Sequence, residues 1–243
     1  MPRLTRKWKI ALAVVGLLLV GVVGAGAWVL QAMQSAEFWE SSIADFEDQD
    51  RADPPAPGSV LFTGSSSIVK WSSLAEDMAP IPVLNRGFGG SHIAHVNHFA
   101  DRIVSPYAPS AVVLYAGDND LAAGSPKTPE SVAADFEQFV SLVHAAHPGV
   151  PVYFLSIKPS LQRWDRWPVM RRANEAIEAW ARATPDVEYI DVATPMLGAD
   201  GKPRPELFVL DGLHLSAEGY VLWTGIVRPV LLEAWPRLSA RAR

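Results

Sequence analysis

The chain has 243 residues, no cysteine and a net charge of −5, from 21 basic and 26 acidic side chains. Without cysteine it can form neither a disulfide nor a zinc–thiolate site. Beyond residue 30 the acidic and basic residues are interspersed and form no basic stripe, so we expect no nucleic-acid partner.

The N-terminal segment is typical of a membrane span. Residues 10–30 contain no charged side chain and would reach about 30 Å as a helix. The residues before it include no acidic side chain but four basic ones, Arg3, Arg6, Lys7 and Lys9. By the positive-inside rule, this pattern predicts a cytoplasmic tail over 1–9 and a single-pass anchor over 10–30. We expect the rest of the chain on the periplasmic or extracytoplasmic side of the inner (plasma) membrane.

A cleaved signal peptide is the alternative to an anchor, because residues 25–27 read A-G-A, which fits a cleavage site. The apolar stretch continues past that site through Trp28, Val29 and Leu30. This continuation favours an uncleaved anchor.

Residues 31–58 are predicted to form an amphipathic helix and a stiff linker. Apolar side chains recur at helical spacing at Phe38, Trp39, Ile43 and Phe46. The stretch 53–58, D-P-P-A-P-G, then breaks any helix. We therefore expect the folded domain to cover 59–243, which at about 185 residues is long enough for one sizeable core.

Within this domain, short apolar runs alternate with longer amphipathic segments. The runs interpreted as strands are 59–63, 82–85, 111–116, 150–157 and 187–192. The segments interpreted as helices are 91–103, 129–146, 167–183 and 216–235. The alternation predicts βαβ units and a parallel sheet covered by helices on both faces. Such folds bind ligands just beyond the carboxyl ends of their strands.

Four glycine-containing polar stretches stand at or beyond the ends of predicted strands. They are G-S-S-S at 64–67, N-R-G-F-G-G-S at 85–91, G-D-N-D at 117–120 and D-G-L-H at 211–214. Each is compatible with an ordinary turn, and a serine such as Ser65 is a favoured helix cap. Because parallel strands end at one edge of a sheet, we expect the four stretches to meet.

Together these stretches contain the groups that acyl transfer needs. A serine among 65–67 would be the nucleophile, with His214 as its base and Asp211 to orient the imidazole. Gly90 can bring a backbone N–H close to a substrate, and the Asn119 amide could donate to a developing oxyanion. The N–H of the nucleophilic serine, at a helix start, would be a third donor.

The four stretches, in this order, resemble the blocks of the SGNH (GDSL-type) hydrolase family over about residues 59–235. The resemblance implies a three-layer α/β/α sandwich with a five-stranded parallel sheet, the flavodoxin-like SGNH fold. It implies Ser66 as nucleophile, with Asp211 and His214 as the base pair. The oxyanion hole would comprise Ser66, Gly90 and Asn119, and no cofactor or metal is implied. Ser65 departs from the family, which usually has aspartate before the nucleophile.

Two further sets of residues are open to a functional interpretation. His92, His95 and His98 recur every three residues, but no carboxylate stands at matching spacing before Asp101, so we favour a structural role over a metal site. For Asp118 and Asp120 we expect local turn chemistry, in which each carboxylate bonds nearby backbone N–H groups.

The sequence thus predicts a membrane-anchored serine ester hydrolase of the cell envelope that acts through an acyl-enzyme intermediate. Its substrate would be an acetylated carbohydrate, a lipid or a small ester. Two alternatives remain. One is an O-acyltransferase that uses the same triad, and the other is a non-catalytic envelope scaffold that kept the fold.

Overall fold

The computed structural model describes Trp8, Leu12, Val15, Gly21 and residues 35–241. Two compact units can be distinguished, residues 1–40 and 41–243. Apart from four residues, the predicted tail and anchor lie outside the described part of the chain. Within that part, no helix is long and apolar enough to cross a membrane. The anchor and the cleaved signal peptide therefore both stay predictions.

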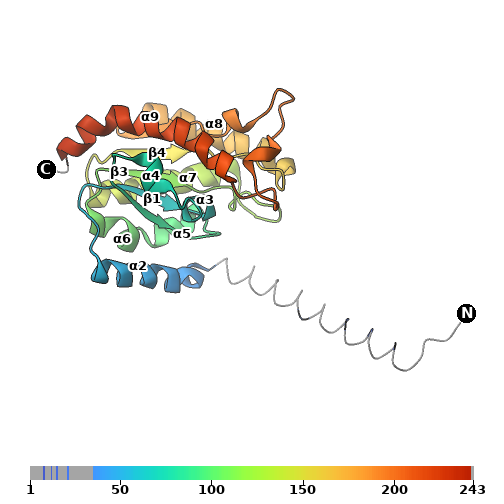
Figure 1. The fold of residues 1–243 in the computed structure, drawn as a ribbon, viewed down its shortest axis with the longest axis horizontal. Helices are drawn as coiled ribbons and strands as arrows, with labels where there is room; N and C mark the ends of the chain where they lie inside the picture. The colour runs from blue at the N-terminus through green and yellow to red at the C-terminus, as the bar shows by residue number, and fades with distance from the viewer. Residues whose placement is uncertain (1–7, 9–11, 13–14, 16–20, 22–34, 242–243) are drawn as a thin grey trace, which may run out of the picture. The chain divides into compact units, whose positions relative to one another are not determined.

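The larger unit is built around a five-stranded sheet in the order β2-β1-β3-β4-β5, in which every neighbouring pair is parallel (Figure 1). The strands are β1 (Val60–Gly64), β2 (Val83–Gly87), β3 (Ala111–Tyr115), β4 (Val152–Leu155) and β5 (Val187–Ile190). The three inner strands are buried along their whole length, as expected when helices cover both faces. All five predicted strands are confirmed.

Short and long helices connect the strands. They are α2 (Glu40–Ala52), α3 (Ser66–Val69), α4 (Leu74–Met78), α5 (Ile93–His98), α6 (Ala100–Ile103), α7 (Pro129–Ala146), α8 (Trp167–Ala183) and α9 (Ala217–Arg241). The limits of α7 and α8 agree with the prediction. The predicted helix over 91–103 is instead two helices, because the backbone leaves helical geometry at Phe99, with φ −101° and ψ 7°.

The helices form two layers around the sheet. On one face α3, α4 and α9 pack on the strands, and the rings of Phe62, Trp71, Tyr115 and Trp223 meet there in edge-on or tilted pairs. On the other face lie α5, α6, α7 and α8, where the Phe136 ring of α7 lies 4.8 Å from the Phe154 ring of β4 and 5.7 Å from the Trp180 ring of α8, between ring centroids. The three-layer α/β/α architecture is therefore confirmed.

Helix α2 is bonded to the edge of the sheet through a buried arginine. The Arg86 guanidinium, at the end of β2, pairs with Asp50, and its Nε donates to the Tyr107 hydroxyl at 2.9 Å. The Tyr107 hydroxyl donates in turn to Asp50 at 2.5 Å. The same guanidinium lies 5.0 Å from the centre of the Phe46 ring. This network explains how a helix that precedes the proline-rich stretch is fixed on the body of the domain.

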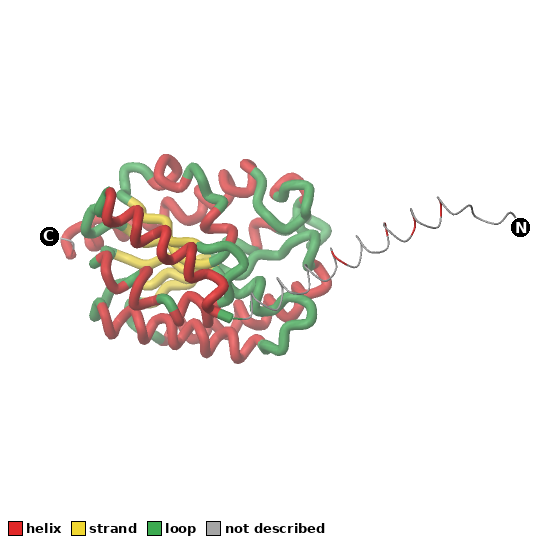
Figure 2. The backbone as a smooth tube through the Cα atoms, turned by 90° about the horizontal axis from the view of Figure 1, so that it is seen from below, coloured by secondary structure: helices red, strands yellow, loops and turns green. Residues whose placement is uncertain are grey.

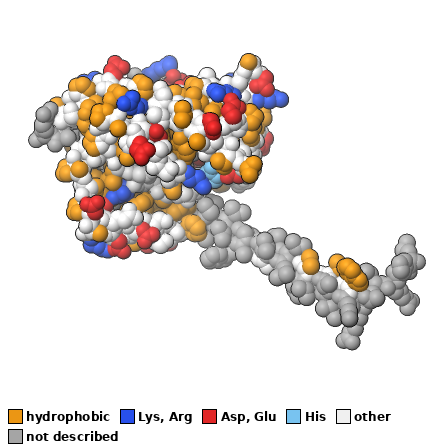
Figure 3. All heavy atoms as spheres, viewed as in Figure 1, with side chains coloured by type: hydrophobic (Ala, Val, Ile, Leu, Met, Phe, Trp, Pro, Cys, Tyr) orange, Lys and Arg blue, Asp and Glu red, His pale blue; other side chains and the backbone are white. Residues whose placement is uncertain are grey.

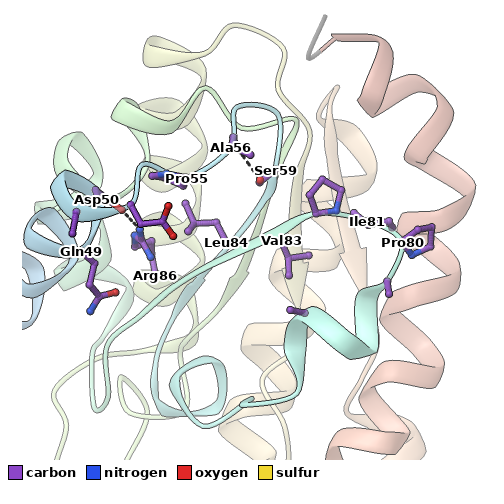
Figure 4. A pocket seen from close by; sticks show the side chains of 15 residues that line it. Gln49, Asp50, Pro55, Ala56, Ser59, Pro80, Ile81, Val83, Leu84 and Arg86 are labelled. Carbon is purple, nitrogen blue, oxygen red and sulfur yellow. Dashed lines mark hydrogen bonds and ion pairs between the residues drawn. The ribbon is translucent and has the colours of Figure 1, made fainter.

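A pocket of about 780 Å³ lies between α2, the proline-rich stretch and the amino-terminal part of β2 (Figure 4). Proline and aliphatic side chains form much of its wall, with Asp50 and Arg86 at one side. None of the predicted site residues lines this pocket. They follow the opposite, carboxyl ends of the strands, where loops gather beyond the sheet (Figure 2).

Candidate active site

A glycine at the end of β1 directs the chain toward Ser66. Gly64 has φ +124°, and a Cβ placed there would lie 1.9 Å from the carbonyl oxygen of Tyr115 in β3. Only glycine fits so close an approach. The next residue, Ser65, donates its N–H to that same oxygen at 2.8 Å. Helix α3 then begins at Ser66, directly beyond the carboxyl edge of the sheet.

Of the three consecutive serines, Ser66 alone is accessible to solvent. Ser65 and Ser67 are buried, whereas Ser66 is partly exposed. Ser65 occupies the N-cap position of α3, but its side chain makes no capping hydrogen bond, so the prediction that its hydroxyl caps the helix is wrong. Burial thus separates the predicted nucleophile from its two neighbours.

Hydrogen bonds join Ser66, His214 and Asp211 in one line. The Ser66 Oγ lies 3.1 Å from His214 Nε2, across 148 residues of sequence. On the other side of the ring, His214 Nδ1 lies 2.6 Å from Asp211 Oδ2. These distances are those of a nucleophile, a base and the carboxylate that orients the base. The structure brings the three predicted residues together in their expected order.

Asp211 is held as an anion by its own loop. Its Oδ1 accepts the backbone N–H groups of Leu213 at 2.8 Å and His214 at 2.9 Å. The hydrogen bond from the His214 ring, together with these backbone bonds, lowers the pKa of Asp211 well below its ordinary value, although burial opposes this effect. An ionised carboxylate fixes the proton of His214 on Nδ1, which leaves Nε2 free to accept from Ser66.

The loop after β2 lies against Ser66 on the opposite side. A Cβ added to Gly89 would be 3.8 Å from the Ser66 Cβ, and the next residue, Gly90, has φ +80°. Asn119 reaches the same loop, because its Nδ2 donates to the carbonyl oxygen of Ser91 at 3.2 Å. Gly90 and Asn119 were predicted to form the oxyanion hole together with Ser66. They therefore lie on two adjacent loops, next to the nucleophile.

The expected local turn chemistry is only part of the role of Asp118, because its carboxylate interacts with the Asn119 backbone N–H and also with two distant cations. Its buried carboxylate lies 3.2 Å from Lys158 Nζ and 3.5 Å from Arg163 Nη1, some 40 residues away or more. Burial raises the pKa of Asp118, but the charges of Lys158 and then Arg163 outweigh burial and hold the pKa below its ordinary value. Lys158 stands three residues beyond the end of β4, directly after the run 150–157 that was predicted as a strand, and a lysine there was the sequence signal for a buried partner.

Asp120 also bonds across the structure, in addition to a backbone N–H within its own turn. Its carboxylate accepts the N–H of Ile93, the first residue of α5, at 3.2 Å and thereby fixes the start of the helix that follows Gly90. Burial raises the pKa of Asp120 to about 7, although the nearby Lys127 opposes this effect. The loop of Asn119 and the loop of Gly90 are thus joined twice, through Asn119 and through Asp120.

Arg163 is a site residue that the sequence reasoning missed. Its Nη1 donates to the Asp118 carbonyl oxygen at 2.8 Å, and its Nη2 donates to Asn119 Oδ1 at 3.0 Å. It stands in an irregular loop with no periodic pattern and 44 positions from Asn119. No local signal identified it, because its partners are set by the meeting of two loops.

The three histidines do not converge on one point. The His92 and His95 rings stack with their centroids 4.8 Å apart, and His95 Nδ1 accepts the His92 backbone N–H at 3.1 Å. His98 packs edge-on against Phe99. Within residues 35–241, and the four described residues before them, no group of three or more His, Cys, Asp or Glu side chains is arranged to hold a metal ion.

Comparison with solved structures supports the fold. A Streptococcus pneumonia protein superposes with a TM-score of 0.68 at 21% identity, over 90% of this chain and 99% of that chain. A GDSL-like lipase from Bacteroides thetaiotaomicron gives 0.67 at 19%, over 83% and 99%. An acetyl-xylooligosaccharide esterase variant from Geobacillus Stearmophilus gives 0.58 at 15%, over 74% and 94%. A search of curated proteins finds no match to the sequence.

The sequence itself matches a family model. The GDSL-like Lipase/Acylhydrolase family matches residues 42–222, which include all the residues of the site described above and well over half of the chain. The fold and the family agree with the resemblance drawn from the four sequence blocks. The chain belongs to the GDSL-like lipase/acylhydrolase family and is a hydrolase of ester bonds.

Proposed function

We propose that this protein cleaves its ester through an acyl-enzyme intermediate on Ser66, with His214 as general base and acid and Asp211 as the orienting carboxylate. The observation that carries the proposal is the continuous hydrogen-bonded line from Ser66 Oγ through the His214 ring to Asp211. A buried or misaligned serine could not act in this way, and Ser66 is neither.

In the first half of the reaction, Ser66 Oγ attacks the ester carbonyl carbon while its proton passes to His214 Nε2. The carbonyl oxygen becomes an oxyanion, and donors on the loops of Gly90 and Asn119 and the N–H of Ser66 stabilise it. The intermediate then expels the alcohol, which takes the proton from His214. The acyl group is left on Ser66.

The second half repeats these steps with water. His214 removes a proton from a water molecule as the water attacks the acyl carbon, and the proton then returns to Ser66 Oγ as the carboxylic acid leaves. Asp211 keeps its charge throughout and offsets the positive charge of the imidazolium. The proposed reaction uses no cofactor.

The substrate that we propose is an acetylated carbohydrate, a lipid or a small ester in the cell envelope. The location rests on the sequence alone, on the uncharged stretch 10–30 and the basic residues before it. The charged side chains of the domain are interspersed on the face drawn in Figure 3, without a stripe of one sign. Such a surface suits a neutral substrate at least as well as a charged one.

The test uses the full-length protein in detergent. A fluorescent phosphonate that reacts with activated serines should label the wild type and not the Ser66→Ala variant. Hydrolysis of p-nitrophenyl acetate, p-nitrophenyl palmitate and acetylated xylo-oligosaccharide then ranks the substrate classes. A protein that no phosphonate labels would be the non-catalytic scaffold, and product that appears on an added sugar instead of in water would identify the acyltransferase.

The anchor has its own test. Mass spectrometry of the membrane fraction should find the intact N-terminal region, with residues 10–30 still attached. A mature N-terminus at Trp28 in a soluble fraction would identify a cleaved signal peptide instead.

A further inference from the structure

We propose that Arg163 is a positioning residue that fixes the Asn119 amide with its nitrogen toward the oxyanion. The inference rests on the proposed function, because it assigns a role to Arg163 through Asn119. It concerns an orientation that asparagine does not set by itself. The amide carries an acceptor oxygen and a donor nitrogen on a freely turning bond, and only the nitrogen can stabilise an oxyanion.

The contacts of Arg163 select one of the two orientations. Its Nη2 donates to Asn119 Oδ1 at 3.0 Å. Arginine has five N–H donors and no acceptor, so a turned amide would face those donors with its own N–H groups and lose the bond. On the far side, Asn119 Nδ2 donates to the Ser91 carbonyl oxygen at 3.2 Å. The nitrogen is thus directed to the loop of Gly90, beside Ser66.

The second arm of the guanidinium holds the backbone. Arg163 Nη1 donates to the Asp118 carbonyl oxygen at 2.8 Å, so one planar group bonds two consecutive residues. A rigid fork loses little entropy when it makes both bonds. The Arg163 side chain is itself largely buried, at 19% exposure, which limits the freedom of the pair to rearrange in solvent.

The positive charge next to the Asn119 amide has an effect in addition to fixing the orientation of the amide. Lys158 and Arg163 both face the buried carboxylate of Asp118, and Arg163 also bonds the Asn119 amide oxygen. A cation that bonds the amide oxygen polarises the amide and strengthens its N–H donors. This polarisation is in place before the reaction begins.

The chain offers a matched control in Arg166. This arginine stands three residues later in the same loop region and donates its Nε to the Leu121 carbonyl oxygen at 3.0 Å. It therefore ties the same two loops together, but its hydrogen bond is to Leu121 and not to Asn119. A role in loop packing alone would affect both arginines alike, whereas a role in the oxyanion hole would affect only Arg163.

The experiment compares Arg163→Met and Arg166→Met in the full-length protein, with kcat and KM measured on p-nitrophenyl acetate. We expect Arg163→Met to lower kcat about 10- to 100-fold with KM changed less than about threefold, because the lost interaction acts in the transition state. We expect Arg166→Met to change kcat less than about threefold. Similar losses of kcat in both variants would overturn the proposal.

A double-mutant cycle gives the decisive readout. In an Asn119→Ala background, Arg163→Met should change kcat less than about threefold, since the amide that it positions is absent. An undiminished loss in that background would overturn the proposal. Arg163→Lys covers the case in which the Met variant does not fold. Lysine keeps the positive charge but cannot make both hydrogen bonds of the guanidinium, so its kcat should lie between those of Arg163→Met and the wild type. If Arg163→Lys had the kcat of the wild type, and Arg163→Met lowered kcat equally with and without Asn119, Arg163 would act through its charge alone and the proposal would be wrong.

Failure of this inference and failure of the proposed function are distinguishable. If Ser66-dependent labelling by the phosphonate is intact and Arg163→Met leaves kcat unchanged, only the role of Arg163 is wrong. If the Ser66→Ala variant is still labelled, the proposed function itself is wrong.

Discussion

His214 is held at Ser66 by its own loop, whereas Asn119 is held there by residues from distant parts of the chain. Asp211 bonds the His214 ring from three residues away, and both of its oxygens are used within residues 211–214. Asn119 is bonded to Ser91 and Arg163, which are 28 and 44 residues away. We refer to these two parts as the base side and the oxyanion side.

The two sides also differ in their access to water. The side chains of His214 and Asp211 are 22% and 44% exposed, while those of Lys158 and Asp118 are 1% and 5% exposed. An exposed base can exchange protons with solvent at each turnover, which its role requires. A buried charged network keeps donors oriented without reorganisation, which suits an oxyanion. Substitutions on the base side should therefore act by removing proton transfer, and substitutions on the oxyanion side by disturbing the orientation of the donors.

The largest expected effect is at Ser66, where the two sides meet. Ser66→Ala should lower kcat by about 10⁴-fold or more, because the covalent step is lost. Ser65→Ala and Ser67→Ala should keep most of the activity, since both side chains are buried. Rates on p-nitrophenyl acetate with purified full-length variants provide the measurement. An active Ser66→Ala with an inactive Ser67→Ala would shift the nucleophile by one residue.

On the base side, His214→Ala should cost nearly as much as loss of the nucleophile. It removes the group that accepts and returns the proton, and leaves only oxyanion stabilisation and binding. Asp211→Asn should be milder, because Asp211 carries no proton in the reaction. The measurement is kcat/KM of both variants and the wild type on p-nitrophenyl acetate. An unimpaired His214→Ala variant would contradict His214 as the base.

On the oxyanion side, Asn119→Ala should lower kcat by about 10²- to 10³-fold with little change in KM. The lost donor acts on charge that develops only in the transition state. Asn119→Asp is a sharper variant, because it places an acceptor where a donor is needed, and its rate should be no higher than that of the alanine variant. A mere increase in KM in either variant would assign Asn119 to substrate binding.

The same contrast explains what the sequence could predict. The parallel sheet, α7 and α8 follow from apolar periodicity and proline or threonine at the helix starts, which are local properties. The pairing of Asp211 with His214 is local too. The distant partners of Asp118, Asp120 and Asn119 depend on which loops meet after folding, so turn propensity could not indicate them. No local sequence pattern indicated Arg163 as a site residue.

The smallest effect that we expect concerns the pH dependence of stability, to which the buried carboxylate of Asp120 and the more exposed carboxylate of Asp211 contribute in opposite directions. The pKa of Asp120 is raised by burial to about 7, so between about pH 4 and 7 the folded chain holds a proton that the unfolded chain releases. Its contribution to stability is thus full in acid and is lost as the pH rises through 7. Asp211 has the opposite sign: its lowered pKa contributes stability at any pH above the unfolded pKa, and this contribution is lost as the pH falls through the folded pKa.

Asp120→Asn tests this sign. The Asn oxygen can still accept the Ile93 N–H, while the charge that the folded state disfavours at high pH is gone. Between pH 5 and 8 the variant should lose less unfolding free energy than the wild type, by about 1 to 3 kcal/mol, which corresponds to several degrees in Tm. Asp211→Asn is the matched control and should leave this slope unchanged, because Asp211 is ionised in both states above pH 5. Equal slopes for wild type and Asp120→Asn would show that Asp120 stays charged in the folded protein, with Lys127 strong enough to outweigh its burial.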